Sequence, residues 1–266
     1  MHRQDKTLPK LIILVILLVP IVVLGFGSLK DIRYKIKAAD GNRWNHLVGQ
    51  GRIVRGEEVK NKITFTFDDG PDHRTTPILL NELDKYHVKG TFFINGHRFH
   101  SRTAAGDENK AVLRDIIRRG HLVGNHTFSH KDVTALDAET WKSEVQQVAY
   151  QVSELTGQPL KLFRPPFGRI NRDNITSLSR NGYTVVMWNL DPLDWMAETP
   201  RALLRRSQRV IEENPEGGVF LLHDTNRNTA QAFPLIMEWI AERNARLAAE
   251  GRPTLEIVGI DQFINN

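Results

Sequence analysis

The chain has 266 residues, of which 40% are hydrophobic and 25% are charged, and this composition excludes a disordered chain and a fibrous repeat. The length suits one large domain or two small ones. There is no cysteine, which excludes a disulfide scaffold, a cysteine nucleophile and an iron–sulfur cluster, so any bound metal must use His, Asp or Glu. The net charge of +5 comes from scattered basic residues, and nucleic-acid binding is not indicated.

The N-terminal part of the chain carries an uncharged apolar segment. Residues 11–27 (LIILVILLVPIVVLGFG) follow a charged tail, 1–10, and precede another charged stretch. These 17 residues are at the short end for a membrane-spanning helix and slightly long for a signal peptide. Only residues 25–27 resemble a cleavage site, so we expect an uncleaved membrane anchor with an extracytoplasmic domain, or a secreted domain if cleavage occurs. Basic residues on both flanks leave its orientation open.

The rest of the chain divides into a stem and one folded domain. Residues 28–60 are polar without a sustained period, and we expect a linker there and a domain over residues 61–266. Within the domain, short runs of β-branched and aromatic residues recur and predict strands. These seven runs span residues 62–67, 90–94, 121–124, 160–163, 183–188, 217–222 and 254–258.

Helical patterns lie between these strands. The clearest runs from Trp141 to Leu155, with apolar residues on one helix face, and Gly157 ends it. Two others span about 111–119 and 230–250. Strands that alternate with helices indicate a parallel sheet, either a doubly wound sheet or an incomplete (β/α) barrel.

Polar motifs at the carboxyl ends of the predicted strands favour the barrel. In a (β/α) barrel these ends share one face, so segments far apart in the sequence converge on one site. We therefore expect an α/β fold, an incomplete (β/α) barrel of about seven parallel strands preceded by the N-terminal membrane segment. The motifs are DDG at 68–70, NHTFSH at 125–130, RPPFG at 164–168, DPLDW at 191–195 and HD at 223–224.

Two of these motifs suggest a metal site. The adjacent acids Asp68 and Asp69 are followed by Gly70, and they are compatible with a simple turn or with a ligand. His126 and His130 have the i, i+4 spacing that puts both imidazoles on one side of a helical turn, although solvent-facing histidines have it too. Two histidines and one aspartate would leave coordination positions open, as in catalytic zinc sites.

The other motifs each allow two interpretations. His223 is either a core histidine or an acid–base group at a strand end. Arg164 precedes two prolines and is either a surface ion-pair partner or a guanidinium held beside a carboxylate. Trp195 suits the core as well as the face of a sugar.

In this order, TFDDGP at 66–71, HTFSH at 126–130, RPPFG at 164–168, DPLDW at 191–195 and LLHD at 221–224 resemble the five motifs of the polysaccharide deacetylase family, carbohydrate esterase family four. The resemblance covers roughly residues 61–260. It implies a distorted (β/α) barrel with one divalent metal ion, usually zinc, that removes N-acetyl groups from aminosugars or O-acetyl groups from xylan.

The resemblance also implies roles for the first three motifs. Asp69, His126 and His130 match the family's metal ligands. Asp68 matches the catalytic base, and Arg164 matches the arginine that pairs with this base.

The last motifs match the acid side of the site. His223 matches the general acid, and Asp191 resembles the carboxylate that orients it. Trp195 and Leu222 match the pocket for the acetyl methyl group. Phe167 stands where many members have tyrosine, and its backbone N–H is expected to bind the oxyanion.

The expected function is removal of N-acetyl groups from a polysaccharide that contains N-acetylglucosamine, such as peptidoglycan or a chitin-like oligomer. The alternatives are an O-acetyl xylan esterase, a deformylase of lipid-linked aminosugars, and an inert glycan-binding module on a membrane stem. Asp68 and His223 argue against the inert module, because binding alone needs neither. The polar segment 96–110, expected to be a loop, departs from the family pattern, and we expect it to shape the substrate groove.

Overall fold

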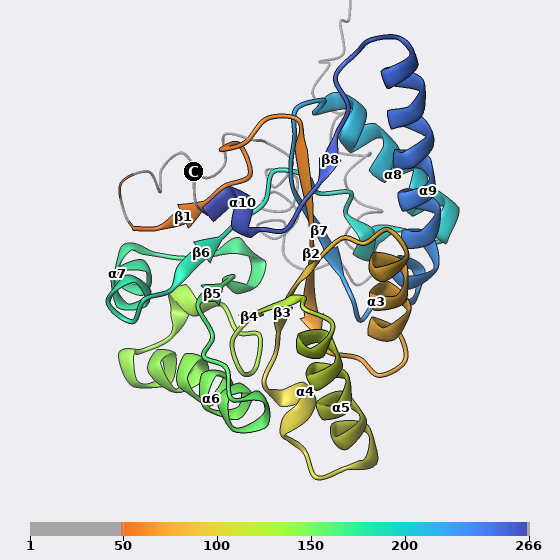
Figure 1. Ribbon diagram of the computed structural model, residues 1–266. Coiled ribbons are helices and arrows are strands. Elements are labelled where there is room, and N and C mark those ends of the chain that lie inside the picture. The colour runs from red at the N-terminus through yellow and green to blue at the C-terminus, as the bar shows by residue number, and fades with distance from the viewer. Residues whose placement is uncertain (1–48, 50, 265–266) are drawn as a thin grey trace, which may run out of the picture. The chain divides into compact units, whose positions relative to one another are not determined.

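The computed structural model describes residue 49 and residues 51–264. Strands and helices alternate along this part of the chain (Figure 1). In chain order they are β1 (Ile53–Val54), β2 (Lys62–Gly70), α3 (Thr76–Lys85), β3 (Thr91–Ile94), α4 (His97–His100), α5 (Ala104–Arg118), β4 (Leu122–Asn125), α6 (Ala138–Thr156), β5 (Leu162–Phe163), α7 (Arg172–Arg180), β6 (Thr184–Val186), α8 (Pro200–Glu213), β7 (Gly217–His223), α9 (Arg227–Ala249), β8 (Glu256–Ile257) and α10 (Asp261–Ile264).

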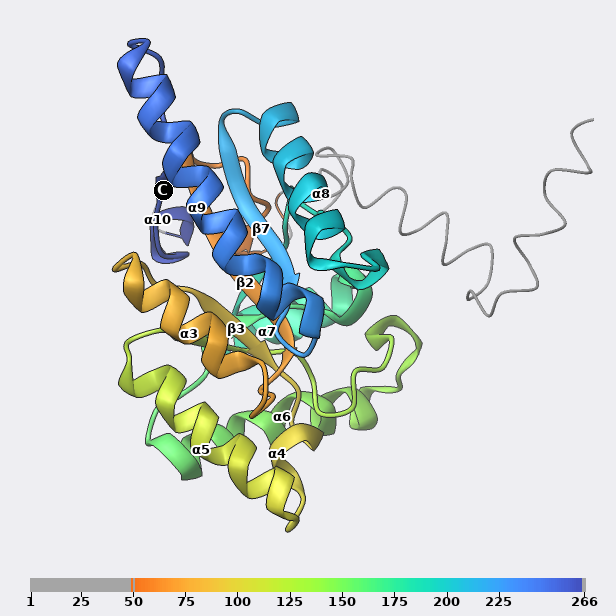
Figure 2. The ribbon, with the colours of Figure 1, turned by 90° about the vertical axis from the view of Figure 1, so that its right-hand side faces the viewer.

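All strand pairs in the sheet are parallel. The strand order is β1-β6-β5-β4-β3-β2-β7, and β8 pairs with the beginning of β2. Helices α3, α8 and α9 stand together on one side of the sheet, as Figure 2 shows. Since every strand of the order points the same way, the carboxyl ends of β2, β4, β5, β6 and β7 lie at one edge.

The sheet curls into an incomplete barrel. Beyond β6, the backbone of Leu190 bridges to β7: its N–H donates to the Val219 carbonyl at 3.1 Å, and its carbonyl accepts from the Leu221 N–H at 2.9 Å. Strand β1 pairs with the other side of β6. The chain segment after β6 is thereby brought next to the end of β7.

A phenylalanine cluster fills the space between the sheet and its helices. The ring of Phe67 stacks on Phe92 with centroids 4.8 Å apart, and Phe233 of α9 packs edge-on against Phe67 at 5.3 Å. All three side chains are fully buried. This apolar support holds β2, whose end carries the two motif acids.

The predicted strands are confirmed, and one more is present. All seven predicted runs contain a strand, but β1 lies within residues 28–60, where we expected only a stem. Two residues are too short to show an alternating pattern. Val54 is nonetheless buried, because the edge of β6 shields it.

One part of the expected fold class is wrong. The barrel of parallel strands is present, but the membrane segment expected ahead of it is not a feature of the observed fold. Within residue 49 and residues 51–264, no helix is both long and apolar enough to cross a membrane. Residues 11–27 lie outside the described residues, and the barrel alone defines the fold class.

The helix predictions hold with shifted boundaries, and the segment 96–110 needs correction. Helix α6 ends where expected, with Gly157 in the left-handed conformation at φ 71°. The polar segment 96–110 is not a continuous loop, because it contains α4 and the first turns of α5. Helix α5 begins after Thr103, whose hydroxyl accepts a hydrogen bond from the Gly106 N–H at 3.1 Å.

Candidate active site

The site begins at the end of β2, where the strand is irregular. The pairing of β2 with β3 shifts between Asp68 and Gly70, and Asp69 between them has φ 74°. The Asn95 N–H donates to the Gly70 carbonyl at 2.9 Å and ties this bulge to the end of β3. Neighbouring acids in a regular strand point to opposite faces. Here the bulge lets both of them face the same site.

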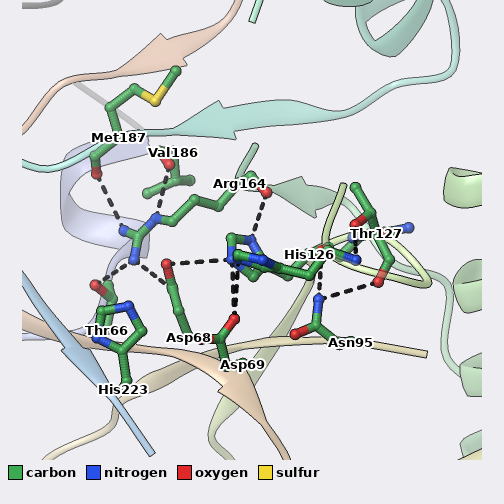
Figure 3. Close-up of polar contacts among 12 residues, drawn as sticks. Thr66, Asp68, Asp69, Asn95, His126, Thr127, Arg164, Val186, Met187 and His223 are labelled. Carbon is green, nitrogen blue, oxygen red and sulfur yellow. Dashed lines mark hydrogen bonds and ion pairs between the residues drawn. The ribbon is translucent and has the colours of Figure 1, made fainter. Parts of the chain in front are cut away.

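Asp69, His126 and His130 form what we call the metal cluster. One ligand atom from each lies within 4.8 Å of the others. The Asp69 Oδ1 atom is 3.6 Å from Nε2 of His126 (Figure 3). It is 3.3 Å from Nε2 of His130. In the described part of the chain this buried oxygen accepts no hydrogen bond. An acceptor without a donor beside two imidazoles fits a cation in the cluster.

The backbone sets the orientation of the two histidines. His126 donates from Nδ1 to the Arg164 carbonyl at 2.7 Å, which leaves its Nε2 lone pair for a metal. The expected helical turn is not present between the histidines. Instead, Thr127 and His130 have φ of 68° and 56°, and this irregular turn brings the ring centroids of the histidines to 5.0 Å.

The charges of the metal cluster suit a cation. Burial acts to raise the pKa of Asp69, but the neighbouring charges of His223, His126 and His130 prevail and lower it. Burial, with the charge of His126, lowers the pKa of His130 to about 4. Near neutral pH the cluster therefore offers a carboxylate and a neutral imidazole, the forms that bind metals.

Asp68 is held by a buried arginine. Arg164 is fully buried and donates from one terminal nitrogen both to Asp68 Oδ1 and to the Thr66 hydroxyl, each at 2.8 Å. Its other nitrogens donate to the carbonyls of Val186 at 3.0 Å and Met187 at 3.2 Å. These bonds fix the guanidinium, as expected for Arg164, and keep a cation beside the carboxylate.

The second oxygen of Asp68 faces the metal cluster. Its Oδ2 atom lies 3.7 Å from Nε2 of His126 (Figure 3). Burial lowers the pKa of Arg164, and the adjacent charge of Asp68 opposes this effect only in part. The predicted base therefore has one oxygen in an ion pair and one beside the cluster.

The partner of His223 is Asp194, and the prediction of Asp191 is wrong. Asp194 Oδ1 lies 2.7 Å from Nδ1 of His223, and Asp194 Oδ2 accepts the backbone N–H of His223 at 2.8 Å and the Thr229 hydroxyl at 2.6 Å. Asp191 instead accepts from the Leu193 N–H at 2.8 Å. Leu193 has φ 53°, and this reversal of the chain directs Asp194 toward β7.

This pairing determines the charge of the histidine. Burial would lower the pKa of His223, but the adjacent carboxylate of Asp194 prevails and raises it to about 10. Burial raises the pKa of Asp191 to about 6, and the charge of Asp194 adds to this effect. His223 is therefore a cation at neutral pH, with Nδ1 bound to Asp194 and Nε2 as its other protonated atom.

The remaining predicted residues surround these pairs. The ring of Phe167 packs edge-on against His130 at 4.6 Å, and the residue is 44% exposed at the edge of the metal cluster. Trp195 is 39% exposed and follows Asp194 in a single 3-10 turn. Leu222 is fully buried next to His223 on β7. Their roles toward an acetyl group stay predictions.

Comparison with known proteins identifies the family. The sequence pattern described as polysaccharide deacetylase matches residues 55–186. A peptidoglycan-N-acetylglucosamine deacetylase of Bacillus cereus is 30% identical over 190 residues, which are 70% of this chain and 84% of that protein. The chain belongs to the polysaccharide deacetylase family.

Other members are similarly close. The peptidoglycan-N-acetylmuramic acid deacetylase PdaA of Bacillus subtilis is 28% identical over 217 residues, 81% of this chain and 80% of that protein. The structure of the peptidoglycan deacetylase PdaC of Bacillus subtilis matches with a TM-score of 0.64 and 26% identity, over 78% of this chain and 91% of that one. Together these relatives confirm the expected class of enzyme, a polysaccharide deacetylase.

Two residues of the site were not predicted from the sequence. Asp194 stands in the same motif as Asp191, and nothing local distinguishes the two acids. Asp224 follows His223 in the last motif but had no assigned role. It is fully buried, and burial raises its pKa to about 7.

Proposed function

We propose that this domain hydrolyses the N-acetyl groups of N-acetylglucosamine units in a polysaccharide, either peptidoglycan or a chitin-like oligomer. One observation carries the proposal: two differently charged groups, the Asp68 carboxylate and the His223 imidazolium, border the same metal cluster. Hydrolysis of an amide needs a base for water and an acid for the amine. A site for binding alone needs neither group.

We propose zinc as the metal. One carboxylate and two imidazoles are a usual zinc donor set that leaves positions open for water and substrate. When bound, such an ion supplies a Lewis acid that polarises the acetyl carbonyl and lowers the pKa of a water molecule. Within the chain, Asp69, His126 and His130 would hold it.

Asp68 would act as the base. Its Oδ2 atom faces the cluster, where it can take a proton from the attacking water. Arg164 pairs with the carboxylate and restricts it to one orientation through the bond to Oδ1. The burial of this pair keeps other water away from the arginine.

His223 would act as the acid. Asp194 holds the imidazolium in place and keeps it protonated, so that Nε2 can donate its proton to the departing amine. The Phe167 N–H would donate to the developing oxyanion, and a donor of this kind contributes about 3 kcal/mol. Trp195 and Leu222, beside the acid, would receive the acetyl methyl group.

The named relatives support peptidoglycan as the first substrate to test. They are named for deacetylation of N-acetylglucosamine or N-acetylmuramic acid in peptidoglycan. Peptidoglycan lies outside the cytoplasm, so the proposal includes an extracytoplasmic location for the domain.

The direct test is incubation of the zinc-loaded protein with peptidoglycan, chitooligosaccharides and acetylated xylan. We expect acetate release and the loss of single acetyl groups by mass from the first two. Asp68→Asn should keep the metal and lose turnover by ~100-fold or more, because the amide cannot accept the proton. Release from xylan alone would identify an esterase. No release from any of these substrates, or an Asp68→Asn variant within a few-fold of the parent, would refute the proposal.

The metal cluster has a separate test. Asp69→Ala, His126→Ala and His130→Ala each remove one of three protein ligands, and we expect each variant to lose bound metal. Elemental analysis after gel filtration measures this directly. His97→Ala is the matched control, because this histidine bonds through Nδ1 to the Phe128 carbonyl at 3.0 Å and lies outside the cluster. Unchanged metal content in the three ligand variants would exclude the assignment.

A further inference from the structure

The first observation is that one ligand of the metal cluster, Asp69, lies in a strained part of the backbone. This is the bulge at the end of β2, which we call the Asp69–Gly70 turn. Asp69 has φ 74°, in the left-handed region that costs conformational free energy for a residue other than glycine. The residue lies inside the irregular end of β2, where regular pairing with β3 is interrupted. Without support, this turn would relax and move the Asp69 carboxylate relative to the two histidines.

The second observation is that Asp224 packs directly on this turn. A Cβ atom added to Gly70 would lie 2.1 Å from Oδ2 and 2.4 Å from Oδ1 of Asp224. Gly70 does not have the positive φ that usually requires glycine. The glycine of the DDG motif is needed because the carboxyl group of Asp224 occupies the place of a side chain.

The third observation is a hydrogen-bond chain behind the turn. The Thr76 hydroxyl donates to Asp224 Oδ2 at 2.6 Å and accepts from the Asp72 N–H at 2.9 Å. The backbone N–H of Asp224 donates to the Asp68 carbonyl at 3.2 Å. All four residues are buried. This chain joins the ends of β2 and β7 to the start of α3, on both sides of Asp69.

We propose that Asp224 and Thr76 are positioning residues that hold the Asp69–Gly70 turn in the conformation that binds the metal. The inference rests on the metal site of the proposed function. Asp224 neighbours the predicted acid, but its hydrogen bond goes to Thr76 and its contact is with Gly70. Its contribution is therefore to the geometry of Asp69, and it transfers no proton.

The test is the affinity of the full chain for zinc, measured by competition with a chelator. Thr76→Val removes the bridging hydroxyl and Asp224→Ala removes its acceptor, so both should weaken zinc binding 10- to 100-fold, as is usual for groups that orient a ligand. Asp224→Asn keeps an oxygen that accepts from Thr76, and its loss should be several-fold smaller. Thr76→Ser should restore most of the affinity lost in Thr76→Val.

Two control variants separate positioning from general destabilisation. Thr75 is buried, and its hydroxyl has no hydrogen-bond partner among the described residues, so Thr75→Val should bind zinc like the parent. Leu178→Ala lowers the melting temperature by opening a cavity in α7, away from the cluster, and should leave the affinity unchanged.

Several outcomes would overturn the inference. They are unchanged affinity in Thr76→Val, an equal loss in Asp224→Asn and Asp224→Ala, and a loss in Leu178→Ala as large as in Thr76→Val. If Asp224→Ala does not fold, the comparison of Thr76→Val with Thr76→Ser decides. A parent protein that binds no zinc would instead refute the metal site of the proposed function, and the two failures are thereby distinguished.

Discussion

Asp191 and Asp194 are three residues apart in one motif and both are buried, but they have different partners. Asp194 binds both the side chain and the backbone of His223. Asp191 caps the turn through Leu193 and accepts from the Trp188 indole at 3.3 Å. A single residue with positive φ between them, Leu193, sends one carboxylate into the site and the other into the turn.

This difference predicts different pH profiles for two matched variants. His223 must be protonated to release the amine, so a raised pKa of His223 extends activity to higher pH. Loss of the carboxylate that raises this pKa therefore moves the alkaline limb to lower pH. In Asp194→Asn we expect the alkaline limb of kcat/KM to shift to lower pH by about 1 to 3 units. In Asp191→Asn the shift should be clearly smaller, because Asp191 acts on His223 only through its charge and not through a hydrogen bond. Measurement from pH 5 to 10 decides, and superimposable limbs for Asp194→Asn and the parent would show that another group charges His223.

At the scale of elements, a residue in the left-handed conformation ends helix α6. Helix α6 stops at Gly157, with φ 71° and its N–H donating to the Ser153 carbonyl at 2.8 Å. Nothing lies within 4 Å of where a Cβ would be. Any cost of a side chain at this position is therefore a cost of backbone conformation alone.

A substitution of Gly157 should have a small effect on the free energy of unfolding, and this effect should come from the backbone conformation alone. We expect Gly157→Ala to lower the free energy of unfolding by about 1 kcal/mol, because alanine disfavours the left-handed region. Gly157→Asn should cost less, since asparagine tolerates this conformation. Urea unfolding of the zinc-free proteins measures both. Equal stability of the alanine variant and the parent would show that the end of α6 rearranges at no cost.

At the scale of the whole molecule, a buried histidine links stability to pH. His121 is 3% exposed where the chain enters β4, and its Nδ1 accepts from the Gly90 N–H at 3.1 Å. Burial, with the charge of Lys89, lowers the pKa of His121 to about 4. Unfolding returns the imidazole to water, where its pKa is about 6.5.

The sign of this effect follows from proton uptake. Between pH 6.5 and 4 the unfolded chain binds more protons at His121, so stability falls as pH falls through that window. From pH 7.5 to 5 the contribution amounts to about 2 kcal/mol. His121→Asn keeps an acceptor for Gly90 but does not titrate, and its loss of stability over this range should be smaller than the parent's by about that amount.

Urea unfolding of the zinc-free protein at both pH values measures this difference. His87→Asn is the matched control, because His87 is an exposed histidine in a left-handed conformation that asparagine tolerates. The control should follow the parent. If His121→Asn also followed the parent, proton uptake at His121 would not contribute to the acid sensitivity of the domain.

The sequence by itself determined the main strands, the parallel barrel and the metal cluster. Strands such as β2 and β7 contain runs of β-branched, aromatic and aliphatic residues, a local property that needs no knowledge of the neighbours. The convergence of the motifs that contain Asp69, His126 and His130 was predictable because they stand at the ends of these strands, and parallel strands bring their ends together. The choice of these three residues as ligands came from the resemblance to the family.

Only the tertiary structure decided which residues and segments pair with each other elsewhere in the domain. The choice of Asp194 over Asp191, the edge strand β1, helix α4 within segment 96–110, and the packing of Asp224 on Gly70 have no periodic signal. Each depends on the position of a chain segment relative to another that is distant in the sequence. Hydrogen bonds and close packing act over a few ångströms, so such partners become defined only when the barrel has brought the segments together.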